Sequence, residues 1–150
     1  MNTKQKLLTP LPIDFDEETH RYIWKPTNEI MANSVTGITG FDMPESKRKG
    51  INAFKHIWAP RGTAVHKALE CHLLDKPIPE EPKYEDWIGP LLTHQYFTKF
   101  FKPLAVEYRV VDLKHSIGGT LDAYGIDTRT NKKVLMDLKT QQSPNANAYN

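Results

Sequence analysis

Gly118-Gly-Thr-Leu-Asp122 decides the fold, together with Asp127-Thr-Arg-Thr-Asn131 and Asp137-Leu-Lys139, which follow it. The middle segment is rich in turn-forming residues, and the flanking residues suit strands. This pattern predicts a β-hairpin whose turn is centred on Arg129 and Thr130. The register of that hairpin pairs the residues of one apolar face as Leu121 with Leu138, Ala123 with Met136, and Gly125 with Val134.

The opposite face of the predicted hairpin carries charge. The same register places Asp122 directly across from Asp137, with Lys139 two residues further along on the same side. Two carboxylates at cross-strand distance repel each other unless a cation lies between them. We therefore expect a metal site with a lysine beside it, which is the combination that cutting a phosphodiester requires. The alternative is a solvated polar face on which Lys139 pairs with one carboxylate.

The composition indicates one soluble globular domain. The chain has 150 residues, of which 39% are hydrophobic and 25% charged, and this excludes a disordered protein. The net charge of +2 is too small to indicate nucleic acid by itself, so any surface for nucleic acid must be local. The single cysteine, Cys71, excludes an internal disulfide and suits the cytoplasm. No stretch approaches the roughly 20 apolar residues of a membrane span, and no signal peptide is expected.

The order of patterns along the chain predicts an α/β fold with a mixed sheet (α+β), in which helices precede a three-stranded meander that carries the site. We expect a single domain over residues 1–150, with its core in residues 61–140. The predicted segments are a tail (1–14), an N-terminal β-hairpin (15–40), a polar basic connection (42–50), two helical regions (61–74 and 84–101), a strand (104–110), the hairpin strands (117–126 and 132–139) and an incomplete C-terminal segment (141–150).

His66 is the second element of the expected site. It lies on the predicted helix 61–74, beside an apolar stripe that recurs every four residues. An imidazole next to two carboxylates suits Mn²⁺ or Mg²⁺. Glu70 and Glu107 are further carboxylates that could reach the same centre, although ion pairs with Lys67 and Arg109 are the competing interpretation. A lone helical histidine is also more often a surface or core residue than a ligand.

Basic residues before and next to His66 form a candidate surface for nucleic acid. Trp58 lies among them and could stack on a base. Solvated basic loops and a core tryptophan are the common alternatives. The basic residues are Lys47, Arg48, Lys49, Lys55, Arg61 and Lys67.

Four segments occur in the order found in the PD-(D/E)XK nuclease superfamily. They are Arg61-Gly-Thr-Ala-Val-His-Lys-Ala-Leu-Glu70, Val106-Glu107, Gly119-Thr-Leu-Asp122 and Met136-Asp-Leu-Lys-Thr140. Together they resemble that superfamily, and within it the RecB-type and CRISPR-adaptation exonucleases and similar phage nucleases. Ser34-Val-Thr36 resembles the opening segment of related phage and mitochondrial enzymes. The resemblance covers roughly residues 20–140 and implies a core like that of restriction endonucleases.

The resemblance implies a role for each matching residue. His66 would be the helical metal ligand, Asp122 the first strand carboxylate and Asp137 the second. The backbone carbonyl of Leu138 would complete the metal shell. Lys139 would orient the attacking water and stabilise developing charge, and Glu107 matches a recurrent glutamate of the family.

One departure from the family concerns the end of the chain. Members of this branch continue into a helix with a Gln-x-x-x-Tyr motif that helps to bind DNA, and residues 141–150 lack that spacing. A shortened chain or a minimal relative would explain this. The expected function is therefore a cytoplasmic, metal-dependent deoxyribonuclease of the exonuclease type, with DNA as partner and a second copy or a recombination or repair protein as a further partner. The alternatives are a module on the same fold that binds nucleic acid or protein without cutting, and a structural domain whose acidic face pairs with lysines.

Overall fold

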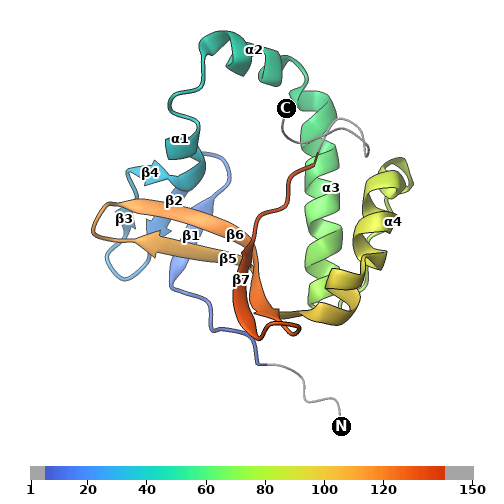
Figure 1. Cartoon of the computed structure of the whole chain (residues 1–150). Helices are drawn as coiled ribbons and strands as arrows, with labels where there is room; N and C mark the ends of the chain where they lie inside the picture. Colours follow the sequence, from blue (N-terminus) through green and yellow to red (C-terminus); the bar gives the residue numbers. More distant parts are fainter. Residues whose placement is uncertain (1–5, 141–150) are drawn as a thin grey trace.

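A computed structural model describes residues 6–140 of the chain, which form a mixed α+β fold (Figure 1). The elements in chain order are β1 (Ile13–Asp16), β2 (Arg21–Trp24), β3 (Glu29–Ile30), β4 (Asn33–Ser34), α1 (Val35–Thr39), α2 (Glu45–Ala53), α3 (Lys55–Leu73), η1 (Pro82–Tyr84), α4 (Glu85–Thr93), η2 (Tyr96–Phe100), β5 (Phe101–Asp112), β6 (Ile117–Asp127) and β7 (Lys132–Met136).

The N-terminal strands form a small antiparallel sheet in the order β1-β2-β3. The sequence predicted only a hairpin here and placed residues 13 and 14 in a tail, and this was wrong. Ile13 pairs with Trp24 and is buried against Tyr22 and Met31, so burial of its side chain draws the segment into a third strand. Within the segment predicted to be a tail, the Leu8 N–H donates to Leu104 O at 2.8 Å.

The second sheet is built around β6. Strand β5 pairs antiparallel with β6 from one end to the other, so β4 and β7 share the opposite edge of β6. The predicted meander is confirmed, and so is its register for Ala123 with Met136 and Gly125 with Val134, whereas the predicted pair of Leu121 with Leu138 does not form because β7 ends at Met136. The register ends there. Among the described residues, positions 119–122 of β6 have no strand partner at this edge, which leaves a gap between β4 and β7.

Helix α3 begins six residues earlier than the expected start at Arg61 and contains Pro60. Proline removes one helical hydrogen bond, and the helix continues through it. Residues 42–50 were predicted to be a connection, yet most of them belong to α2. Ser34 caps the start of α1, since its Oγ accepts a hydrogen bond from the Gly37 N–H at 3.0 Å.

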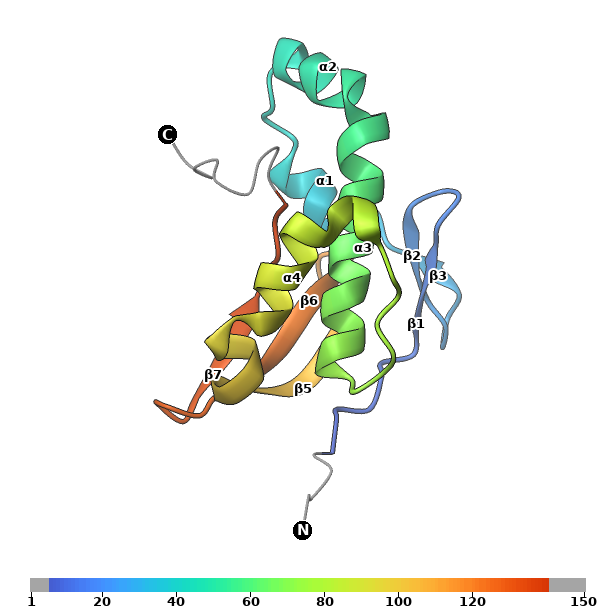
Figure 2. The same ribbon diagram turned by 90° about the vertical axis from the view of Figure 1, so that its right-hand side faces the viewer.

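Helices α3 and α4 lie side by side next to the second sheet, and α2 forms an arch between α1 and the start of α3 (Figures 1 and 2). The contact between α3 and α4 is apolar, with Val65, Ala68 and Ile88 buried at its centre. Leu138, from the segment after β7, packs against the same cluster. Within residues 6–140, no helix has both the length and the apolar character needed to cross a membrane.

Candidate metal centre

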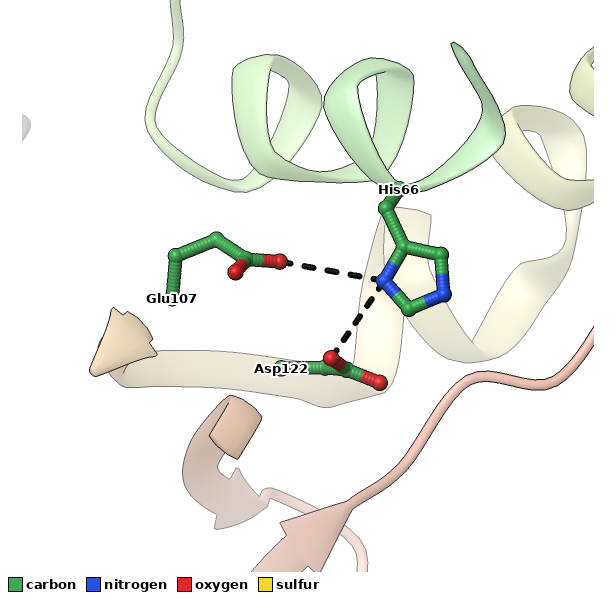
Figure 3. Close-up of side chains that lie close together, drawn as sticks. All are labelled: His66, Glu107 and Asp122. Carbon is green, nitrogen blue, oxygen red and sulfur yellow. Dashed lines mark ion pairs between the residues drawn. The ribbon is translucent and has the colours of Figure 1, made fainter. Parts of the chain in front are cut away.

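Three side chains from three different elements meet beside the gap in the sheet. His66 comes from α3, Glu107 from β5 and Asp122 from β6 (Figure 3). Nδ1 of His66 lies 3.3 Å from Oδ1 of Asp122 and 3.8 Å from Oε1 of Glu107. One potential ligand atom of each residue lies within 4.8 Å of the others, so the three residues could hold a metal ion. His66, Glu107 and Asp122 are called the metal group below.

The two carboxylates of this group are cross-strand neighbours. Glu107 lies between the pairs Val106–Ala123 and Tyr108–Leu121, which places it opposite Asp122 on the adjacent strand. Its φ of 46° falls in the left-handed region, which is uncommon for a residue other than glycine. Such backbone conformations persist where the surrounding structure enforces them, and they cluster at functional sites. The acid opposite Asp122 is therefore Glu107, and not Asp137 as the sequence predicted.

The charges of this group are strongly coupled. Hydrogen bonding to Asp122, then to Glu107, raises the pKa of His66 from 6.5 to about 10, against the effect of its burial. Burial acts to raise the pKa of Asp122, but the His66 ring and the Leu138 N–H together lower it. An imidazolium thus neutralises part of the acidic pair at neutral pH. A divalent cation would take over that role, because a histidine ligand must be deprotonated.

The position of His66 follows from the burial of its helix. Val65, Ala68 and Leu69 are 1–4% exposed, and they hold one face of α3 against the rest of the fold. His66 follows Val65 and lies at the border of that face, where its side chain is 31% exposed. It can therefore reach Asp122 while remaining open to a ligand.

His66 and Glu107 line a pocket of about 860 Å³. On the side formed by α3, small residues lie between Trp58 and His66, and β5 and the segment after β7 also line the pocket. The lining residues are Glu17, Trp58, Ala59, Gly62, Thr63, His66, Lys67, Glu70, Glu107, Arg109, Leu138, Lys139 and Thr140. A substrate in this pocket would meet His66, Glu107 and Lys139.

The Asp137-Leu-Lys139 segment leaves the ladder at the end of β7. Asp137 and Lys139 bind each other at 2.9 Å, with side chains 67% and 71% exposed, and Asp137 is not part of the metal group. The predicted pairing of Asp122 with Asp137 is therefore wrong. The Leu138 N–H donates to the Oδ2 of Asp122 instead, and this bond diverts the chain from strand pairing. A ligand role for the Leu138 carbonyl stays a prediction.

The basic residues that were expected to form one surface for nucleic acid lie in different environments. Lys47, Arg48 and Lys49 lie on exposed α2, where Lys49 pairs with Glu45 at 2.9 Å. Arg61 is only 6% exposed, and its guanidinium lies 5.1 Å from the centre of the Trp87 ring. This burial contradicts Arg61 as a surface contact to DNA.

The structure also decides between the alternative interpretations given for Glu70 and Trp58. Lys67 pairs with Glu70 at 2.7 Å, the competing interpretation for Glu70. Trp58 is 36% exposed and lines the pocket, so the interpretation of it as a core residue is wrong.

From the sequence, Glu107 was expected only as a further carboxylate of the site, and Arg109 and Thr140 were not expected to belong to it. The sequence did contain a signal that Glu107 faces Asp122. The connection between Asp112 and Ile117 has four residues, and its length sets the register of β5 against β6. The side chain of Arg109 lies 3.8 Å from Asp14 of β1, so its position depends on the contact between the two sheets. Comparison with known protein families, with characterised proteins and with solved structures finds no match to this chain.

Proposed function

We propose that the protein is a metal-dependent deoxyribonuclease of the PD-(D/E)XK type that hydrolyses phosphodiester bonds, preferentially from the ends of DNA. The observation that carries the proposal is the group of His66, Glu107 and Asp122, of which His66 and Glu107 line a pocket that Lys139 also lines. Hard oxygen ligands and one imidazole suit Mg²⁺ or Mn²⁺. A restriction-endonuclease-like core is part of the proposal, and the mixed sheet with α3 beside it is compatible with such a core.

Each residue would contribute one function to the reaction. When bound, a divalent ion lowers the pKa of a coordinated water and offsets the charge of the phosphate. Asp122, Glu107 and neutral His66 would hold that ion, and the Leu138 N–H would keep the Asp122 carboxylate oriented. Lys139 would leave its exposed ion pair with Asp137 and place a positive charge near the phosphate, where charge develops in the transition state.

Hydrolysis of linear and of closed circular DNA, each with Mg²⁺ and with Mn²⁺, tests the proposal. We expect cleavage of the linear form, and a loss of at least about 100-fold in the Lys139→Ala and Asp122→Asn variants, in keeping with the loss of one charge-stabilising group. Leu135→Ala is the control, because Leu135 is 66% exposed on β7 and does not line the pocket. Cleavage that persists in both site variants would refute the assignment of this centre.

A second candidate function is a module on the same fold that binds nucleic acid or a partner protein without cutting. The observation that favours it is the pairing of Lys139 with Asp137. In this pair the Lys139 ammonium binds a carboxylate that is not part of the metal group. Salt-dependent binding of DNA without hydrolysis in either cation would support this function.

A further inference from the structure

We propose that Trp58 is a stacking platform for an unpaired nucleobase, and that the pocket therefore selects single-stranded over double-stranded nucleic acid. The proposal rests on the proposed function for the location of the phosphate. One base would lie on the indole ring while a phosphate of the same strand occupies the His66 end of the pocket. Trp58 would then be a specificity-determining residue outside the metal group.

The helix α3 places Trp58 and His66 on one wall of the same pocket. Gly62 lies four residues after Trp58 and four before His66, so the three positions follow one side of the helix, and all three line the pocket. Eight helical residues span about 12 Å. This distance exceeds the rise of about 3.4 Å between stacked nucleotides. The base at Trp58 and the phosphate at His66 would therefore belong to different nucleotides of one strand.

The chemistry of the Trp58 side chain points to an aromatic ligand. Its Nε1–H donates to Ile51 O at 2.8 Å, which uses the only polar group of the indole. What the ring still offers to the pocket is apolar aromatic surface, and the residue is 36% exposed. The same hydrogen bond ties the ring to α2, so its orientation is set before a ligand arrives. Bases stack on such rings regardless of their sequence.

The α3 side chains between Trp58 and His66 are small. A Cβ built at Gly62 would meet only Thr140 Oγ1, at 3.6 Å, and the neighbouring Ala59 adds one methyl group. A strand passing from the indole to the metal group therefore meets no large side chain of α3 on the way. Paired bases inside a duplex have both faces covered by their neighbours, so a base within a strand can stack on Trp58 only when it is unpaired.

Binding of a labelled 12-nucleotide thymidine strand and of a blunt duplex of equal length tests the inference. Fluorescence anisotropy is measured with Ca²⁺ under conditions that leave the DNA intact. We expect Trp58→Leu to weaken binding of the single strand by roughly 5- to 100-fold, the effect of losing one stacked base. Trp58→Phe should lose less, because it keeps an aromatic ring. Binding of the duplex should change by less than about twofold in both variants.

A second variant covers the case in which Trp58→Leu impairs folding. Gly62→Leu fills the space between Trp58 and His66 and leaves residue 58 itself unchanged, and we expect it to weaken binding of the single strand to a similar degree. Gly50→Leu is its matched control, since a Cβ at Gly50 meets nothing within 4 Å and Gly50 does not line the pocket. Unchanged binding of the single strand in folded Gly62→Leu and Trp58→Leu overturns the inference, and so does an equal loss for the duplex.

The outcomes separate this inference from the proposed function. Binding of a single strand that depends on Trp58, without hydrolysis in any cation, supports the platform and refutes the nuclease. Hydrolysis that requires Asp122 but is indifferent to Trp58 and Gly62 on single strands supports the nuclease and refutes the platform. A wild-type protein that neither binds nor cuts either DNA refutes both.

Discussion

Glu107 and Asp122 stand opposite each other on neighbouring antiparallel strands, and Nδ1 of one histidine, His66, lies within 3.8 Å of both carboxylates. Two facing carboxylates repel each other and attract a cation. In the metal-free protein the imidazolium of His66 supplies the positive charge. Protonation of His66 and the binding of a metal are therefore competing ways to balance the same two acids.

The competition predicts that a divalent ion displaces a proton. Because the pKa of His66 is raised to about 10, the ring is protonated at pH 7.5 and must lose its proton to become a ligand. We expect about one proton to be released for each Mn²⁺ bound, and the affinity for Mn²⁺ to rise with pH. Isothermal titration calorimetry in buffers of different ionisation enthalpy measures this release. In His66→Ala the dependence on the buffer should vanish, and a wild-type protein without it would contradict the prediction.

The raised pKa also makes the stability of the metal-free protein depend on pH. The folded state holds the His66 proton more tightly than the unfolded state, in which the pKa is near 6.5. The resulting stabilisation is fully present below pH 6.5 and is lost as pH rises through about 10. We expect the difference in Tm between wild type and His66→Gln, measured with EDTA, to shrink over this range. A difference that grows with pH would show that the sign is wrong.

Glu107 and Asp137 should differ in their effect on the binding of metal. Glu107 belongs to the metal group, whereas Asp137 is 67% exposed and pairs with Lys139. We expect Glu107→Gln to weaken Mn²⁺ by more than about 10-fold, since even residues that only support a ligand contribute 10- to 100-fold. Asp137→Asn should change the affinity by less than about threefold. The reverse order of the two variants would restore Asp137 as a ligand.

The contact between the two sheets gives a prediction about stability. A Cβ added at Gly118 would overlap with the Cβ and ring of buried Tyr22, whose hydroxyl lies 2.9 Å from Thr120 Oγ1. We expect Gly118→Ala to lower the free energy of unfolding by about 1–3 kcal/mol, the usual cost of overpacking. Gly50→Ala on open α2 is the matched control and should raise it by about 0.4–1 kcal/mol. Urea unfolding measures both, and equal effects would contradict the packing at Gly118.

Several features followed from the sequence because they depend on neighbouring residues. The turn at Arg129 and Thr130 determined the register of β6 against β7, and Ser34 determined the start of α1 through its own hydroxyl. The apolar periodicity around Val65 determined the side of α3 from which His66 projects. In each of these cases a local dihedral preference or a periodic pattern is sufficient.

Only the tertiary structure decided which acid faces Asp122 and which aromatic faces the pocket. Periodicity assigns a residue to one face of a strand, but it does not say which neighbouring strand continues beside it. Strand β7 ends at Met136 because the Leu138 N–H bonds to the Asp122 side chain, and β5 then supplies the opposing carboxylate from Glu107. The burial of Arg61 under Trp87 and the exposure of Trp58 likewise depend on where α4 and α2 pack against α3. Those contacts join different elements of the fold, and their energies are settled only when the elements assemble.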